Sequence, residues 1–236
     1  METKLLKIAE IARQKPKEKF TSLYHYINKE MLLKCHKQLL GNKATGIDDV
    51  TKQEYSKELN SNIENLVTKL RNHSYKPQAV KRVYIPKGEG KTRPLGIPSY
   101  EDKIVQMDLN KILQSIYEVD FKDFSYGFRP KRNCHSAIKA LNKVIENGRI
   151  NYVVDADIKG FFNNVNHDWM IKFLEVRIGD PNIIRLVKKF LKAGLMDNGV
   201  LMTTEIGTPQ GSIVSPTLAN IYLHYSLDLW FEKVII

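Results

Sequence analysis

The chain has 236 residues, of which 42% are apolar, and a net charge of +11, which is typical of a globular protein with a sizeable core. No apolar run approaches the roughly 18 residues that span a bilayer, and the N-terminus lacks the apolar core of a signal peptide. We therefore expect a cytoplasmic protein with no membrane partner. Cys35 and Cys134 are too few for a zinc cluster or a secreted disulfide scaffold, so reduced thiols are expected.

The positive charge is concentrated in one half of the chain. Residues 1–100 hold 20 Lys and Arg against 10 Asp and Glu, whereas residues 101–236 hold 17 against 16. A basic half favours binding to a polyanion, and nucleic acid is the leading candidate. A basic surface that only keeps the protein soluble is the alternative, although such charge is more often spread along the chain.

Apolar residues at helical spacing predict several helices before residue 75, and a basic linker at 15–19 follows the first of them. The predicted helices cover residues 1–13, 23–40, 51–55 and 58–71, with Thr51 as an N-cap. A polar loop at 41–50 contains two glycines and Lys43. Such a loop either contacts phosphates through backbone amides or simply joins two helices.

Residues 79–86 and 93–98 read as two strands of a β-hairpin joined by a polar turn. Lys87, Lys91 and Arg93 lie at its tip, and three cations next to glycines suit a triphosphate or a nucleic-acid backbone.

The triplet Gly90-Lys91-Thr92 imitates the end of a nucleotide-binding P-loop. That motif needs a glycine five residues before Gly90, where Ile85 stands, and a helix afterwards, where Pro94 comes instead. We therefore reject a P-loop.

A strongly amphipathic helix is predicted over residues 101–119 and is expected to serve the core. The following segment, 124–135, places three aromatic residues beside Arg129, Lys131 and Arg132. This composition can stack on bases and pair with phosphates, or it can plug the core with buried rings. A helix over 136–146 is predicted next.

Residues 150–157 combine a β-branched apolar run with two carboxylates, Asp155 and Asp157. The run predicts a buried strand, and side chains two residues apart on a strand point the same way. A hard cation is the natural partner of such oxygens. The alternative is a solvated strand end that binds nothing.

The rest of the chain predicts two helices, a hairpin, a shaped loop and a buried helix. These are residues 166–176 with Asn166 as N-cap, the basic amphipathic stretch 182–192, the turn-rich stretch 194–205, the Gly- and Pro-containing loop 207–216, and residues 218–229.

Four stretches stand in an order that resembles the fingers and palm of a reverse transcriptase encoded by a group II intron. They are I-P-K-G-E-G-K-T-R-P-L-G-I-P, Y-G-F-R-P-K-R-N, D-A-D-I-K-G-F-F and G-T-P-Q-G-S-I-V-S-P. The loop G-N-K-A-T-G-I-D and the preceding helices are similar to the N-terminal extension of these enzymes. The resemblance covers roughly residues 20 to 230.

The resemblance implies roles for individual residues. Asp157 matches the first metal-binding aspartate, and the Ile158 carbonyl would join it on one of two Mg²⁺ ions. Other matched residues would surround the incoming nucleotide. They are Gly160 and Phe161 under the triphosphate, Phe162 as the gate against a 2′-hydroxyl, Gln210 in the pocket, and Lys87 and Arg93 as fingers cations. Lys43, Lys91, Arg129, Lys131 and Arg132 are candidates for binding RNA. Asp155 has no role in the family.

One departure from the family is the absence of a later aromatic-Ala-Asp-Asp turn, which supplies the other catalytic carboxylates. We therefore expect the N-terminal portion of a longer protein. The expected fold is α+β, a right-hand polymerase with fingers and an incomplete palm. Its expected divisions are a helical extension over residues 1–75, fingers over 76–150 and a partial palm over 151–236.

The implied function of the parent is RNA-directed DNA synthesis with a role in intron splicing and mobility. The expected partners are an RNA template, group II intron RNA, a DNA primer and deoxynucleoside triphosphates, with a homodimer formed through an open sheet edge. The 236-residue chain itself is expected to bind RNA without polymerising. Two alternatives stay open: a module that only binds RNA for splicing, and a retron-type reverse transcriptase.

Overall fold

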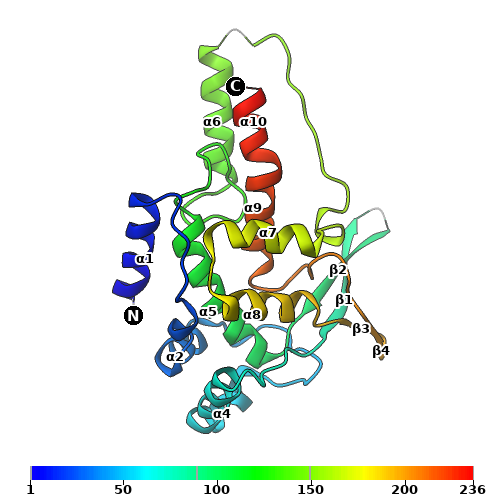
Figure 1. Ribbon diagram of the computed structural model, residues 1–236. Coiled ribbons are helices and arrows are strands. Elements are labelled where there is room, and N and C mark those ends of the chain that lie inside the picture. Colours follow the sequence, from blue (N-terminus) through cyan, green and yellow to red (C-terminus); the bar gives the residue numbers. More distant parts are fainter. Residues whose placement is uncertain (1, 89, 149, 236) are drawn as a thin grey trace.

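A computed structural model describes residues 2–88, 90–148 and 150–235. Figure 1 shows a helical body with a small sheet at one side. The helices are α1 (Glu2–Gln14), α2 (Lys29–Gln38), α3 (Lys52–Lys57), α4 (Leu59–Arg71), α5 (Tyr100–Tyr117), α6 (Cys134–Asn147), α7 (His167–Arg177), α8 (Pro181–Leu191), α9 (Ser215–Leu223) and α10 (Leu229–Val234). Short helical turns lie at Tyr24–Tyr26 and Phe161–Asn163, and a π-helix at His224–Asp228 joins α9 to α10. The mixed α+β class is confirmed.

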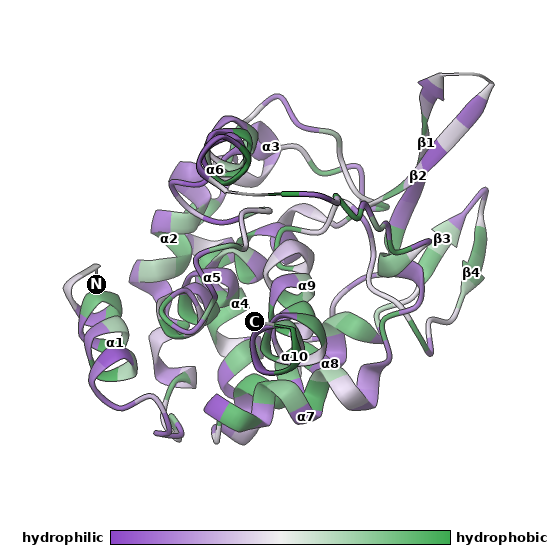
Figure 2. Ribbon diagram, turned by 90° about the horizontal axis from the view of Figure 1, so that it is seen from above, coloured by the Kyte–Doolittle hydropathy of each residue, from purple (hydrophilic) through white to green (hydrophobic). Residues whose placement is uncertain are grey.

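The sheet has four strands, β1 (Val80–Gly88), β2 (Lys91–Ile97), β3 (Leu195–Asp197) and β4 (Val200–Met202), in the order β2-β1-β3-β4. Both hairpins predicted from the sequence are confirmed. The two hairpins are joined into one sheet by a parallel pairing of β1 with β3, at Val80 and Leu195. No local sequence pattern predicts this pairing. Seen from above, the strands lie on one side and most helices on the other (Figure 2).

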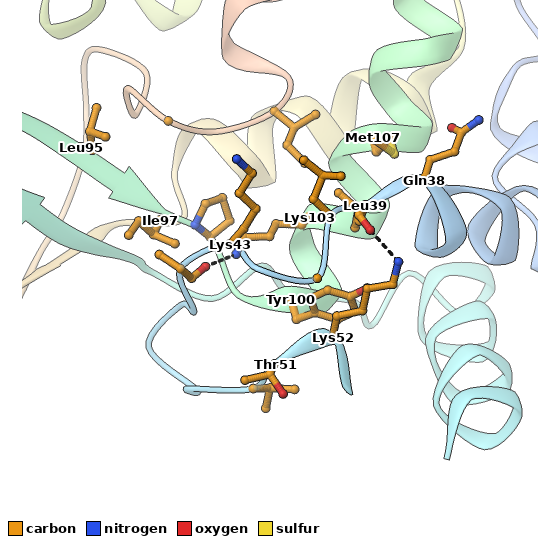
Figure 3. A pocket seen from close by; sticks show the side chains of 17 residues that line it. Gln38, Leu39, Lys43, Thr51, Lys52, Leu95, Ile97, Tyr100, Lys103 and Met107 are labelled. Atoms are coloured by element: carbon orange, nitrogen blue, oxygen red, sulfur yellow. Dashed lines mark hydrogen bonds between the residues drawn. The ribbon is translucent and has the colours of Figure 1, made fainter. Parts of the chain in front are cut away.

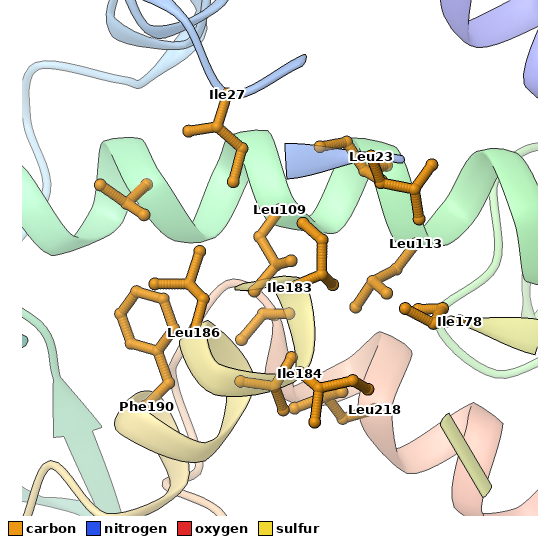
Figure 4. Close-up of a cluster of buried hydrophobic side chains, with 14 of the residues drawn as sticks. Leu23, Ile27, Leu109, Leu113, Ile178, Ile183, Ile184, Leu186, Phe190 and Leu218 are labelled. Atoms are coloured by element: carbon orange, nitrogen blue, oxygen red, sulfur yellow. The ribbon is translucent and has the colours of Figure 1, made fainter. Parts of the chain in front are cut away.

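The core is a continuous cluster of buried side chains around α5. Leu109 and Leu113 of α5 lie in one cluster with residues of neighbouring helices, including Ile183 and Phe190 of α8 (Figure 4). Fully burying one such side chain contributes about 1.5–3 kcal/mol. The core role predicted for the helix at 101–119 is therefore confirmed, since its apolar stripe is wholly buried.

Side-chain caps define several helix starts. Thr51 and Glu54 form a reciprocal capping box at α3, and Asn166 accepts a hydrogen bond from Trp169 N at α7, as predicted. The single helix expected over 23–40 is wrong, because the chain leaves helical geometry at Ile27 and Asn28 begins α2 as a new N-cap.

A buried arginine fastens the N-terminal helix to the rest of the body. The Arg177 side chain is 2% exposed, and its guanidinium donates to the carbonyls of Ala12 and Lys15, each at 3.0 Å. Arg177 Nε lies 3.0 Å from Asp120 Oδ2. Burial raises the pKa of Asp120 to about 6, and the nearby Arg177 opposes this shift. α1 is thus held by charged hydrogen bonds at its C-terminal end.

Asp180 fixes the chain between α1 and α2. Its carboxylate accepts the N–H groups of Leu23 at 2.7 Å and Tyr24 at 2.8 Å, and it also caps α8 through Asn182 N at 2.9 Å. One buried carboxylate therefore positions two segments far apart in sequence.

The buried strand predicted at 150–157 is wrong. Residues 151–158 form neither helix nor strand, and Tyr152, Val153 and Val154 are 89%, 72% and 89% exposed. A strand needs hydrogen-bonded neighbours, and no strand in the described ranges pairs with this segment. The β-branched run therefore remains extended chain in solvent.

The helix α6 is present as predicted but contributes nothing to the core, since none of its residues is buried. Figure 1 shows α6 and α10 extending from one end of the body. Exposed large apolar residues on α6 are Ile138, Leu141, Val144 and Ile145. Cys35 and Cys134 are free thiols. No helix in the described ranges combines the length and the apolar character needed to cross a membrane.

Candidate functional site

The loop at 207–211 is fixed on one side by the segment that follows Gly160. Gly207 N donates to Val165 O and Thr208 N donates to Phe162 O, both at 2.7 Å. Gly207 has a positive φ of 86°, and a Cβ there would lie 2.9 Å from Phe162 O and from Asn163 O. Only glycine fits this close approach.

The same loop is fixed on its other side by the base of the β1–β2 hairpin. Gly96 N donates to Gln210 O at 2.5 Å. A Cβ on Gly211 would lie 2.8 Å from Gly96 O, so two backbones meet here without side chains between them. The loop therefore joins the β1–β2 hairpin to the Phe162 segment.

A cavity of about 110 Å³ lies where these segments meet. Phe162 and Gln210 line it, so two residues assigned to the nucleotide pocket by resemblance are brought together. Arg82 of β1 also lines it, and its Nε is buried with no hydrogen-bond partner in the described part of the chain. Arg82 was missed from the sequence. Strand alternation could have found it, because it shares a face with the buried Val80.

The turn before the cavity depends on Gly160, which adopts φ 64° and ψ 30°. Its carbonyl accepts hydrogen bonds from Asn163 N at 3.0 Å and from Asn164 Nδ2 at 2.9 Å. The Phe161 ring packs edge-on against Phe162 at 5.5 Å and against Tyr222 of α9 at 6.1 Å. The backbone that would lie under a triphosphate is thus anchored to α9.

Asp157 and Ile158 lie in the exposed segment before this turn. No group of three or more His, Cys, Asp or Glu among the described residues could hold a metal ion. One carboxylate and one carbonyl supply too few oxygens for two Mg²⁺ ions, each of which prefers about six. The residues described here therefore do not by themselves fit the metal pair that reverse transcriptases generally use.

The three hairpin cations, Lys87, Lys91 and Arg93, lie along the exposed arm of the β1–β2 hairpin. Arg93 pairs with Ile85 across the two strands, and Lys87 lies next to a bulge between Pro86 and Gly88. Lys91 begins β2. In Figure 2 the tip of this hairpin projects beyond the rest of the sheet. The three cations are thus placed on a projecting arm that carries no buried residue beyond Val80 on β1.

A larger cavity of about 550 Å³ separates the loop that carries Lys43 from α5 (Figure 3). Lys103 Nζ donates to Ala44 O and Lys52 Nζ donates to Leu39 O, each at 2.5 Å, which fixes the loop. Desolvation lowers the pKa of Lys103. Of the described residues, no acidic side chain lines the cavity, and Lys43 is an exposed residue of its lining.

The basic segment after α5 divides into two kinds of side chain. Arg129 is buried and donates to Glu118 Oε1 at 2.9 Å and to the carbonyls of Lys122 and Ser125. This geometry favours a structural role for Arg129. By contrast, Lys131 is exposed at a positive φ of 61°.

Arg132 has internal partners, as Arg129 does, but it remains partly exposed. It pairs with Asp123 at 2.7 Å and lies over the ring of Tyr126, yet its partner carboxylate is fully exposed. Of the three cations, Lys131 and Arg132 are therefore the ones within reach of an external ligand.

The curated relatives of this chain include a protein encoded by a group II intron. The chain is 41% identical over 225 residues to the group II intron-encoded protein LtrA of Lactococcus lactis subsp. cremoris, a match that covers 93% of this chain and 37% of the relative. It is 37% identical over 187 residues to protein YkfC of Escherichia coli K12, covering 78% of this chain and 49% of the relative. The chain thus spans less than half the length of either relative.

The fold is similar to that of a chain in the solved structure titled "Partial Cas6-RT-Cas1--Cas2 complex". The TM-score is 0.50 at 20% identity, over 89% of this chain and 34% of that one, so this likeness concerns the fold alone. Residues 85–236 match the family described as "Reverse transcriptase (RNA-dependent DNA polymerase)". Because this match covers more than half of the chain, the chain belongs to the reverse transcriptase family.

Proposed function

We propose that this chain is the nucleotide-selecting and template-binding part of an RNA-directed DNA polymerase of the group II intron type. The observation that carries the proposal is the cavity shared by Phe162, Gln210 and Arg82. An unpaired guanidinium N–H that is buried at a cavity wall favours an anionic ligand, because a buried donor without a partner is unfavourable.

In this proposal the incoming deoxynucleoside triphosphate lies between the hairpin arm and the Phe162 turn. Lys87 and Arg93 would pair with its phosphates, and the backbone at Gly160 and Phe161 would lie beneath them. The Phe162 ring would exclude a 2′-hydroxyl, and Gln210 would line the base or sugar. Preorganised cations of this kind stabilise the charge that develops in phosphoryl transfer.

RNA would lie against the loop that carries Lys43. The 550 Å³ cavity beside this loop offers apolar walls and lysines with no acidic neighbour in its lining, which suits a nucleotide strand. Lys91, Lys131 and Arg132 would add contacts to the phosphates of template, intron RNA or DNA primer. Arg129 would act indirectly by shaping its loop. A homodimer formed through an open sheet edge stays a prediction.

Asp157 would be one ligand of the metal pair, with carboxylates from elsewhere in the complete enzyme. The bound metals would supply Lewis-acid stabilisation of the transferring phosphate. The part played by this chain's own residues is to bind and orient the nucleotide and template.

A chimera tests the proposal. This chain replaces the matching segment of the lactococcal relative, and primer extension is measured with deoxynucleotides and with ribonucleotides. Asp157→Asn should abolish synthesis, whereas the matched control Asp155→Asn should retain most of it. Phe162→Ala should admit ribonucleotides. A chimera that extends primers equally well with Asp157→Asn would contradict the site.

A splicing role without polymerisation is the second candidate. It is favoured by the absence of a metal-holding cluster among the described residues. A chimera that restores intron splicing but never extends a primer would support it over the first proposal.

A further inference from the structure

The helix α8 presents opposite chemistries on its two sides. Its apolar residues, including Ile183, Leu186 and Phe190, point into the core (Figure 4). Arg185, Lys188 and Lys189 lie on the other side, and the first two are exposed. Residues three and four apart on a helix are surface neighbours, so these cations form one stripe.

Two other segments add cations to this stripe. Lys19, Arg185 and Lys188 line one shallow cavity of about 500 Å³. Lys189 Nζ donates to His73 O at 2.8 Å and to Tyr75 O at 2.5 Å, which places it beside Lys76. We call Lys19, Lys76, Arg185, Lys188 and Lys189 the α8 basic face.

The charge of this face is not compensated within the described residues. None of the five cations forms an ion pair there, and Arg185 donates only to Asn182 Oδ1 at 3.2 Å. Asp180 lies nearby, but its carboxylate is buried and accepts backbone N–H groups. Among the described residues, Glu175 is the single acidic one that lines the cavity. Desolvation and repulsion from Arg185 and Lys76 lower the pKa of Lys189.

We infer that the α8 basic face is a second RNA-binding surface, which holds a phosphate backbone away from the nucleotide cavity. The two cavities share no lining residue. Three of the five cations belong to the second half of the chain, whose net charge is close to zero. A nearly neutral half therefore carries a local polyanion site. This inference rests on the proposed function, since it presumes that RNA is the partner.

A phosphate backbone explains the face better than an anionic membrane does. Helices that bind membranes direct large apolar side chains into the bilayer. The large apolar residues of α8 are instead buried in the core. The cations are therefore left to bind through charge alone, as contacts to phosphates do.

The test measures RNA binding by fluorescence anisotropy at several salt concentrations. The probe is a labelled RNA hairpin, and a parallel assay uses vesicles of phosphatidylserine and phosphatidylcholine. The variant combines Lys19→Gln, Arg185→Gln and Lys188→Gln. The control combines Lys139→Gln, Lys143→Gln and Lys233→Gln, which removes the same charge from exposed positions on α6 and α10. All six positions are exposed, so both variants should fold, and circular dichroism checks this.

The slope of the logarithm of the binding constant against the logarithm of the salt concentration should be shallower by roughly 2 in the variant. This corresponds to about 0.7–0.9 per lost phosphate contact. The control should change little. Equal changes in both would overturn the inference and indicate net charge alone. Loss of vesicle binding with intact RNA binding would also overturn it. If the unchanged chain binds RNA but the variant keeps its slope, this inference fails and the proposed function stands. If the unchanged chain binds no RNA, both fail.

Discussion

The loop at 207–211 and the segment at 150–158 both carry family motifs, yet they differ completely in how they are held. Backbone hydrogen bonds fix the loop on two sides, to Phe162 O and to Gly96 N. The segment with Asp157 is exposed and belongs to no sheet. The comparison teaches that a motif supplies chemical groups, while neighbouring backbone supplies their geometry.

Protease access should show the largest difference between the two regions. Local opening free energies range from about zero in exposed segments to the global value of about 5–15 kcal/mol in cores. Chymotrypsin at low concentration should therefore cut first after Tyr152, long before Tyr117, which is fully buried in α5. Mass spectrometry of early fragments checks this. Early cleavage within 207–223 instead would contradict the comparison.

Substitution of Gly207 should destabilise the fixed loop strongly. Gly207→Ala forces a Cβ against two carbonyl oxygens at 2.9 Å and strains a positive φ, so we expect a loss of about 3 kcal/mol in the free energy of unfolding. The matched control is Gly127→Ala, where nothing lies within 4 Å of the added atom. Urea unfolding should place the control within about 1 kcal/mol of the unchanged chain.

The stability of the segment that leads into β1 should depend on pH through Asp102. This carboxyl accepts hydrogen bonds from Tyr75 Oη and from Gln78 N, just before β1. Burial raises the pKa of Asp102 to about 6, partly opposed by these hydrogen bonds. An Asp side chain in an unfolded chain has a pKa near 3.9. Between about pH 4 and pH 6, Asp102 is therefore protonated in the folded state and ionised in the unfolded state.

The contribution of Asp102 to the free energy of unfolding should therefore be greatest below about pH 4. It should fall by about 2–3 kcal/mol as the pH rises to about 6. Asp102→Asn should flatten that part of the profile, measured by urea unfolding at each pH. A profile with the same slope in the variant would show that other groups cause the dependence. Asp120, whose pKa burial also raises to about 6, contributes in the same direction and remains in the variant.

Two valines give the smallest and cleanest comparison. Val165 is 1% exposed and accepts the hydrogen bond of Gly207 N, whereas Val154 is 89% exposed. Val165→Ala should lower the free energy of unfolding by about 2 kcal/mol, and Val154→Ala by less than about 0.5 kcal/mol. Thermal unfolding of the two variants in parallel measures the difference. Equal losses would mean that residues 150–154 are packed in solution.

The sequence predicted those parts of the fold whose signals are local. Apolar periodicity placed α5 and α8, and capping residues placed the starts of α3 and α7. The strand at 150–157 was mispredicted because β-branched residues report a preference for strands but not the presence of a neighbour. The parallel pairing of β1 with β3 depends on contacts between distant residues, which no window of sequence contains.

The candidate site also combines residues with a local sequence signal and residues without one. Phe162 and Gln210 were identified through motifs, and the structure places both at one cavity. Arg82 carries no motif, so only its position on β1 reveals it. Arg129 shows the converse. The composition of its segment suggests an external ligand, whereas the buried Arg129 side chain pairs with Glu118 of the same chain. The α8 basic face stayed hidden because its cations come from three separate segments.

The contacts of Arg177 and Asp180 bear on the order in which the chain folds during synthesis. Arg177 binds Ala12 O across 165 residues, and Asp180 binds Leu23 N across 157. At translation rates of about 5–20 residues per second, the N-terminal helix waits roughly 8–30 s for these partners after its own synthesis. For the first part of that interval, until α5 has been synthesised, the apolar side of α1, with Ile8 and Ala12, has no docking surface. Ribosome-associated chaperones therefore have a defined segment and a defined time window in which to protect this protein.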